Sequence, residues 1–351
     1  MVTAMCFAND GAFYASGNQL IPIAETDITI KKEILTLKKI RDQFIEVTVY
    51  YEFFNPGEEK TITVGFEAFS PSGDVDVRPK NGMHPYMRDF TVQLNGEMLK
   101  FSIAYVTDSA YRKNGFLTSK KLPDILTNIA DANYVDFFYV YHFKAKFKKG
   151  LNIVKHTYHY DLSDNVYCNY QFDYVLTAAN RWANKQIDDF TLVLDIGEFE
   201  SFNVGKDFFK SRNDWLINGI GKSMEVKGAQ NTITDKDAVE FHIQKGNLVF
   251  QKKNFRPAGE LFVYSRNYME EERANYIPFS YYQHDQIEKP VTELQKRILR
   301  NLPFARRGYI FQNPDLKKFY EKQEWYIPNP NYEPDVSTLT EIEEQWINKW
   351  Q

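Results

Sequence analysis

The chain has 351 residues, which exceeds the size at which one hydrophobic core usually keeps growing, so we expect two or three domains. Aromatic residues make up 16% of it, and such rings favour β-sheets. A net charge of −4 without long Lys and Arg runs argues against nucleic acid as a partner. No apolar stretch approaches the roughly 20 residues of a transmembrane helix, so we expect a mainly β protein without a transmembrane segment.

Residues 1–8 have the pattern of the last part of a secretion signal. They form an apolar octet with small side chains at Cys6 and Ala8, as a signal peptidase requires before Asn9. The octet lacks a positively charged start and is short, so on this interpretation the precursor begins further upstream; the alternative is an ordinary N-terminal strand. Cleavage would leave only Cys168, which excludes an internal disulfide. We expect a secreted or periplasmic protein of the cell envelope.

A first β-sandwich domain is predicted for residues 9–149. Apolar and polar residues alternate along 44–53 and along 61–66, and the turn residues 55–57 between them predict an antiparallel hairpin. Further strands are expected over 89–94, 100–106 and 135–147, with a turn at Asn95-Gly96 and a short helix inserted within 111–129.

A second β domain is predicted for residues 150–285, because Lys148-Lys149-Gly150 has the composition of a boundary. Regularly spaced short strands are typical of a sandwich. Residues 270–274 and 278–289 have the mixed charge and the turn-forming composition of a linker. The strands are expected over 152–160, 173–177, 191–196, 239–243, 247–251 and 261–265.

Over residues 286–351 the spacing of apolar residues changes from that of strands to that of helices, and we expect these residues to form a small three-helix domain. Thr292 and Gln295 form a capping box for a first helix that runs to about Leu302. Gly308 supplies the backbone freedom with which this helix ends.

Two more helix starts follow. Asn313-Pro314 suits the cap and first turn of a second helix, and Thr340 with Glu343 caps a third. The apolar side of the third helix is expected to carry Ile342, Trp346 and Ile347.

The C-terminal domain resembles the bacterial YARHG domain over roughly residues 290–351. The residues that carry the resemblance are Arg300-Asn301, Phe304-Ala305-Arg306-Arg307-Gly308-Tyr309-Ile310-Phe311, Leu316, Trp325-Tyr326 and Leu339-Thr340. The family is named for Tyr-Ala-Arg-His-Gly, and this chain is a Phe-Ala-Arg-Arg-Gly variant with Phe304 for Tyr and Arg307 for His. The resemblance implies an extracellular module of undetermined activity, and the loss of the His weakens any acid–base role.

The upstream region resembles a family of bacterial exported β proteins of unknown function. The likeness rests on residues 9–17, Phe53-Phe54-Asn55-Pro56-Gly57 and the segment 174–182. It implies export and no defined reaction.

Five cations lie within twelve residues of the C-terminal domain: Lys296, Arg297, Arg300, Arg306 and Arg307. A guanidinium group binds a carboxylate or phosphate through two parallel hydrogen bonds, and cell-wall peptides or acidic glycans would offer such anions. The alternative is internal pairing with the acidic segment 321–344, with Arg306 as the best internal candidate and Arg307 as the best exposed one. Tyr309, Trp325 and Tyr326 could likewise form an aromatic platform for a sugar or fill the domain's core.

No metal centre, cofactor or catalytic residue is predicted. His156 and His159 lie three apart on an expected strand, so they point to opposite faces and cannot hold one ion. No Gly-x-Ser-x-Gly elbow occurs.

These observations predict a binding or adaptor protein of the cell envelope that contacts a cell-wall or glycan ligand, or an envelope protein, through its C-terminal domain. The alternatives are an envelope hydrolase with a site between domains and a structural or assembly protein. A deep pocket with perturbed acids would favour an enzyme, and a shallow aromatic and cationic surface would favour a binding protein. Exposed sheet edges would favour a structural or assembly protein.

Overall fold

The structure is a computed structural model that describes residues 12–13, 19–23, 26–107, 117–129, 135–231, 233–267, 277–280 and 287–351. The expected signal remnant, residues 1–8, lies outside these ranges. Strands dominate the regular structure before residue 267, and helices dominate after residue 292. This is the mainly β chain with a helical C-terminal region that the sequence predicts.

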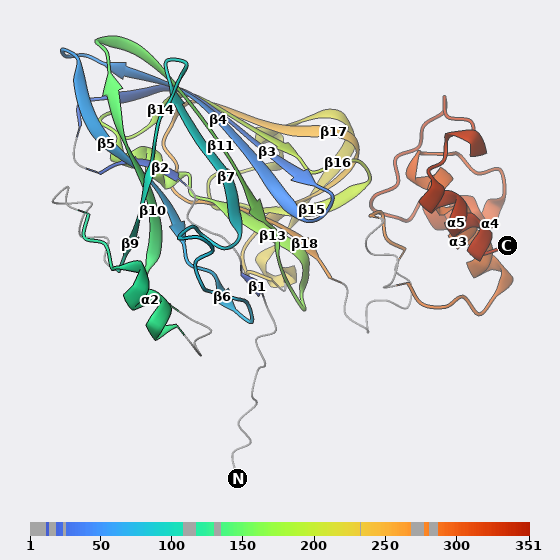
Figure 1. Ribbon diagram of the computed structural model, residues 1–351. Helices are drawn as coiled ribbons and strands as arrows, with labels where there is room; N and C mark the ends of the chain where they lie inside the picture. Colours follow the sequence, from blue (N-terminus) through green and yellow to red (C-terminus); the bar gives the residue numbers. More distant parts are fainter. Residues whose placement is uncertain are drawn as a thin grey trace.

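Fourteen of the described strands form one large sheet (Figure 1). In spatial order its path is β6 (Ser72–Gly73), β1 (Ala12–Phe13), β12 (Ser163–Asn165), β13 (Cys168–Tyr174), β18 (Leu261–Arg266), β15 (Glu200–Gly205), β17 (Ala238–Phe255), β14 (Ile187–Asp195), β3 (Thr29–Ile40), β4 (Phe44–Asn55), β11 (Gly150–Asp161), β7 (Met87–Leu94) and β8 (Glu97–Met98), and β16 (Trp215–Val226) pairs with β17 off this path. Neighbours are antiparallel except β3 and β14, which run parallel.

A second sheet of four strands packs against part of the first. Its order is β2 (Gln19–Pro22), β5 (Lys60–Phe69), β10 (Phe138–Phe147) and β9 (Ser102–Val106), and the inserted helix α2 (Leu122–Asn128) follows β9 as expected. Phe66 of the small sheet lies 4.9 Å from the ring of Tyr158 and 5.1 Å from that of Phe90 on the large sheet. Interdigitated inner faces of this kind make a sandwich.

The expected hairpin between residues 44–53 and 61–66 is wrong. β4 pairs with β3 and β11 in the large sheet, whereas β5 pairs with β2 and β10 in the small one. The chain therefore turns a corner at Asn55, whose buried amide donates to the carbonyl oxygens of Glu58 at 2.9 Å and Phe147 at 3.3 Å. A corner and a hairpin use the same turn residues, so local pattern does not separate them.

The large sheet also crosses the boundary expected between residues 149 and 150. β11 begins at Gly150 and pairs along its length with β4, so strands from both sides of the boundary share one ladder. One buried apolar cluster likewise contains Val49 and Val92 together with Leu192 and Val263. The sheet curls on itself: Tyr160 of β11 donates to the backbone oxygen of Asp173 on β13 at 3.3 Å. The two β regions thus form one curled unit and not two successive sandwiches.

The C-terminal helices begin where local chemistry predicts. They are α3 (Glu293–Arg306), α4 (Pro314–Tyr320) and α5 (Glu341–Lys349), and α3 and α5 both carry the expected capping boxes. After α3, Gly308 has a φ of 85° and donates to the oxygen of Ala305, while Tyr309 donates to that of Phe304. These two bonds are a Schellman motif, which favours glycine at the left-handed position.

Helix α3 continues four residues beyond the predicted end, through Pro303. Proline cannot donate the helical bond to the oxygen of Leu299. The indole nitrogen of Trp346 on α5 donates to that oxygen instead, at 2.7 Å. The packing of α5 therefore replaces the missing bond. On α5 itself, the expected apolar position Ile342 is 62% exposed, and Glu343 takes the buried place.

Candidate functional site

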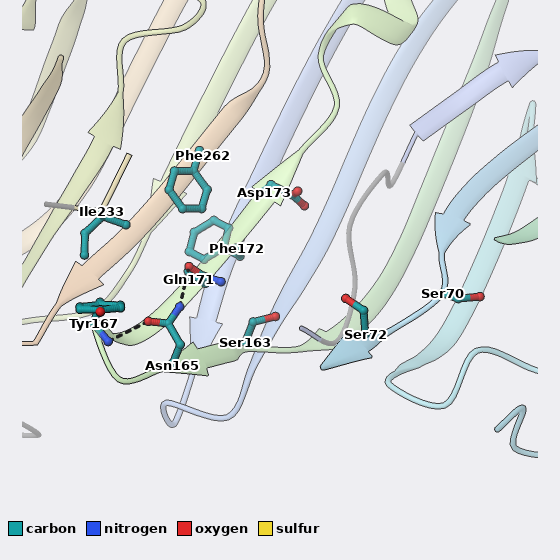
Figure 2. A pocket seen from close by; sticks show the side chains of 10 residues that line it. All are labelled: Ser70, Ser72, Ser163, Asn165, Tyr167, Gln171, Phe172, Asp173, Ile233 and Phe262. Atoms are coloured by element: carbon teal, nitrogen blue, oxygen red, sulfur yellow. Dashed lines mark hydrogen bonds between the residues drawn. The ribbon is translucent and has the colours of Figure 1, made fainter. Parts of the chain in front are cut away.

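A pocket of about 430 Å³ lies where β12, β13 and β18 of the large sheet meet the turn before β6 (Figure 2). Its size falls at the lower end of the range of ligand pockets, about 300 to 1,000 Å³. Figure 2 shows apolar rings and an isoleucine at one end and hydroxyl and carboxyl groups toward the other. The described lining residues are Ser70, Ser72, Ser163, Asn165, Tyr167, Gln171, Phe172, Asp173, Ile233 and Phe262.

Asp173 is the ionisable group of this pocket. It stands opposite Phe262 in the antiparallel ladder of β13 and β18, so both side chains leave the sheet on one face. Its Oδ1 atom has no hydrogen-bond partner among the described residues. Burial, reinforced by the negative charge of Glu260, raises the pKa of Asp173 to about 7. Near neutral pH the group therefore exists both as a donor and as an acceptor, and a perturbed acid in a pocket is typical of a functional site.

The β12–β13 turn positions the other polar groups. The side-chain oxygen of Asn165 accepts from the backbone N–H groups of Tyr167 at 2.8 Å and Cys168 at 3.0 Å, which closes the turn. The tyrosine ring, 48% exposed, then forms part of the pocket's apolar end. The amide of Asn165 donates to the Gln171 oxygen at 3.3 Å and leaves the Gln171 NH₂ group as a donor on the wall. None of the described lining residues is basic, so the pocket favours a neutral or amine-bearing ligand over an anion.

A serine, a histidine and a glutamate meet elsewhere on the sheet, where sequence spacing gives no signal. Ser201 Oγ lies 2.7 Å from His242 Nδ1, and His242 Nε2 lies 4.0 Å from Glu240 Oε1. Such a grouping can serve nucleophilic catalysis. Here His242 is 4% exposed, and the ring of Phe279 lies 6.1 Å from it. Burial and the charge of Lys222 lower the pKa of His242 to about 3, which makes the imidazole a weak base near neutral pH.

The residues predicted to bind a ligand in the C-terminal domain mostly lie inside it. Arg306 is 2% exposed and donates to the backbone oxygen of Pro278 at 2.9 Å. Trp325 and Tyr326 are 6% and 7% exposed and donate to the backbone oxygens of Ile277 at 2.9 Å and Tyr309 at 2.7 Å. The rings thus fill the core, and the structure brings them together without making a platform on the surface.

Arg300 is half-buried on α3, and Tyr309 is half-buried beside Phe311, with ring centroids 4.8 Å apart. Arg300 has no hydrogen bond or ion pair within the described part of the chain. Arg300 therefore stays available at the surface of α3.

Arg307, expected to be the exposed cation, is an internal partner. Its guanidinium makes a two-pronged ion pair with Glu343, in which Nη2 donates to Oε2 at 2.9 Å. The Arg307 side chain is 14% exposed and that of Glu343 is completely buried. The same carboxylate accepts from the backbone N–H of Thr340 at 2.8 Å and so caps α5. The carboxylate of Glu343 therefore connects α3 to α5 and also caps the N-terminus of α5.

The C-terminal region matches a known domain family over residues 280–351. That family is the YARHG domain. No curated protein matches the chain in sequence.

Two solved structures are distantly similar to this chain. A Legionella pneumophila protein named a "putative nutrient binding protein" aligns over 98% of this chain and 100% of its own, with 18% identity and a TM-score of 0.49. An M1 zinc metallopeptidase from Deinococcus radiodurans covers 68% of this chain with 8% identity and a TM-score of 0.26, and this chain covers 43% of it. At these scores we draw no functional conclusion from either likeness.

The YARHG domain and the segment before it dock on the β unit. The ring of Phe199, between β14 and β15, lies 5.0 Å below the guanidinium of Arg307 and 6.0 Å from the ring of Phe279. The hydroxyl of Ser280 accepts from the backbone N–H of Ser201 at 2.9 Å, and Lys222 of β16 donates to the oxygen of Tyr326 at 3.2 Å. The domain's core cluster therefore extends onto the sheet.

No helix among the described residues is long and apolar enough to cross a membrane. Within the same residues, no three His, Cys, Asp or Glu side chains gather closely enough to hold a metal ion.

Proposed function

We propose that the protein is an exported binding or adaptor protein of the cell envelope whose ligand site is the Asp173 pocket. The observation that carries this proposal is a pocket of about 430 Å³ with aromatic rings at one end and one carboxyl side chain, Asp173, among its described lining residues. Burial raises the pKa of Asp173 to about 7. A glycan hydrolase needs a second carboxyl group beside such an acid, and the described lining residues provide none. Export is supported by the apolar residues 1–8 and by the match to the YARHG domain. The resemblance to that family implies an extracellular module.

The lining favours a saccharide. A pyranose ring has an apolar C–H face that packs on aromatic rings, which Tyr167 and Phe262 provide, and hydroxyl and amide edges that need donors and acceptors. The NH₂ of Gln171 and the carboxyl of Asp173 supply both. The pocket holds an acid and no described base, so we propose a neutral, N-acetylated glycan of the cell wall in place of the acidic glycan expected at the C-terminal domain.

Sedimentation with insoluble peptidoglycan tests this function. We expect the purified chain to be retained on the pellet and to release no soluble fragments, as a binder does and a hydrolase does not. Asp173→Leu removes the donor and acceptor, and the loss of one or two hydrogen bonds should weaken binding about tenfold.

Asp74→Leu is the matched control, because Asp74 is exposed and does not line the pocket. It should leave retention unchanged. Equal retention of wild type and Asp173→Leu, or fragment release that either substitution abolishes, would contradict the proposal.

The hydrolase alternative has one observation in its favour, the contact between Ser201 and His242. We expect this group to be part of the packing beneath Phe279, because His242 is buried and weakly basic. A fluorophosphonate probe, which labels activated serines, should therefore not label the protein between about pH 6 and 9. Labelling that disappears in Ser201→Ala would instead establish the hydrolase.

A further inference from the structure

A second pocket, of about 310 Å³, lies at the C-terminal part of β17 and shares no described lining residue with the Asp173 pocket. It is formed between that strand and the segment 208–214. Its described lining residues are Phe208, Phe209, Lys210, Asp214, Phe250, Lys252, Asn254, Phe255 and Arg256.

The floor of this pocket is aromatic. Phe209, Phe250 and Phe255 are 6%, 2% and 4% exposed, and they belong to the main core. The half-buried Phe208 lies over them, with its ring 5.2 Å from that of Phe250 and 6.2 Å from that of Phe255. Because the floor rings are recessed and do not protrude, they can receive an apolar group but cannot insert into a membrane.

The rim is cationic. Lys210, Lys252 and Arg256 are exposed, and within the described part of the chain none of them forms an ion pair. Lys253, the neighbour of Lys252 on the other face of β17, does pair, with Asp189 at 2.8 Å. The rim cations are thus not engaged in ion pairs with described side chains.

Asp214 is the acid among the described lining residues, and its carboxylate is engaged. Its Oδ2 accepts from the backbone N–H groups of Lys210 and Ser211, each at 2.9 Å. Although burial opposes them, these bonds and the charges of Lys252 and Lys210 lower the pKa of Asp214, so it stays ionised. Three cations against one carboxylate leave the pocket positive.

Arg256 is held in a defined orientation. Its Nε donates to the side-chain oxygen of Gln186 at 3.0 Å, and Gln186 in turn donates to Asn254 at 3.2 Å. The two terminal nitrogens of the guanidinium remain as donors, and a pre-oriented guanidinium suits an oxyanion.

We propose that this pocket binds a small ligand that joins an oxyanion, carboxylate or phosphate, to an aromatic or aliphatic group. The oxyanion lies at the rim between Lys252 and Arg256, and the apolar group lies on the phenylalanine floor. The protein then has two binding sites of opposite character, because the Asp173 pocket is acidic and this one is basic.

Saturation-transfer NMR, which detects ligand binding to the full chain, tests the proposal with two anionic probes and one neutral control. N-acetylphenylalanine and phenyl phosphate carry the ring with a carboxylate and with a phosphate, and N-acetylphenylalanine amide carries the ring without charge. We expect at least one anionic probe to bind, the amide to bind at least tenfold more weakly, and acetate or inorganic phosphate alone to bind weakly. The anion that binds better identifies the oxyanion.

The double variant Lys252→Gln/Arg256→Gln should weaken anionic binding at least tenfold, while Lys253→Gln changes it less than twofold. All three residues are exposed or half-exposed, so the variants should fold, which thermal melting checks. Asp173→Leu should leave this binding unchanged, so failure of one site is distinguishable from failure of the other. No binding of either anionic probe at millimolar concentration, or equal binding of the amide, would overturn the proposal.

Discussion

Arg307→Ala should destabilise the YARHG domain by about 3 to 5 kcal/mol, the usual cost of removing one partner of a buried ion pair. The substitution leaves the carboxylate of Glu343 buried without its guanidinium, and it removes the cation that lies over Phe199. Unfolding should be followed by tryptophan fluorescence, because three of the five tryptophans lie in this domain.

Two variants calibrate this expectation. Glu344→Ala changes the exposed neighbour of Glu343 and should cost less than about 0.5 kcal/mol. The double variant Arg307→Met/Glu343→Leu should recover part of the loss, because no uncompensated charge remains. An unchanged stability of Arg307→Ala together with lost ligand binding would contradict the internal pairing and restore Arg307 as a surface ligand residue.

Raising the pH from about 6.5 to 8 should lower the free energy of unfolding by about 2 kcal/mol, because each proton that the folded chain alone retains costs about 1.4 kcal/mol for every tenfold fall in proton concentration, while buried histidines offset about 1 kcal/mol of that loss. Burial raises the pKa of Glu33 to about 8, and that of Asp173 and Glu240 to about 7. In this range the unfolded chain has already released these protons while the folded chain still holds them. The unfolded state therefore binds fewer protons, and stability falls as the pH rises until the folded groups ionise.

Between about pH 4.5 and 6.5 the same loss is offset by buried histidines. Burial lowers the pKa of His84 and His156 to about 4 and of His242 to about 3, so the unfolded chain takes up protons there that the folded chain does not. Stability should thus be nearly flat across this range.

Glu33→Gln isolates the largest contribution, because Glu33 is 4% exposed and its burial raises the pKa of its carboxyl to about 8. Urea titrations should show the variant losing less than about 0.5 kcal/mol between about pH 6.5 and 8 where the wild type loses about 2 kcal/mol. Equal pH dependence of the two proteins would show that Glu33 ionises normally in the folded state.

The helix termini of the YARHG domain were predictable because each depends on neighbouring residues. A Thr at the cap with Gln or Glu three residues later, and Gly308 after the last turn, satisfy backbone groups within a few positions. The continuation of α3 through Pro303 was not predictable in this way, since it depends on Trp346, which lies 43 positions later in the chain.

Many of the strands were predictable from their alternating residues, but others and the pairing were not. β17 was expected as two strands, 239–243 and 247–251, yet it runs without a break through Gly246, which faces Gly219 of β16. A Cβ added to Gly246 would lie 2.1 Å from the oxygen of Asn218, so the pairing requires glycine. Strands β3, β15 and β16 were not expected, and without β3 the parallel pairing with β14 could not be inferred.

The candidate site depends on contacts between distant residues. Asp173 is one polar residue on an alternating strand, and only its neighbours Phe262 and Glu260, almost ninety positions later in the chain, make it a perturbed acid. For the cations, the sequence pattern left surface binding and internal pairing both open, and the burial of Glu343 decides for pairing at Arg307.

The most direct measurement of the central claim is calorimetric titration of an N-acetylglucosamine oligosaccharide into the wild type and Asp173→Leu at about pH 7, in two buffers of different ionisation enthalpy. Because the pKa of Asp173 is about 7, contact with the ligand should change its protonation, so wild-type binding should exchange protons with the buffer. We predict that both the proton exchange and most of the affinity disappear in Asp173→Leu. Wild-type binding with no proton exchange and full affinity in the variant, or no binding at all, would contradict the assignment of this pocket as the ligand site.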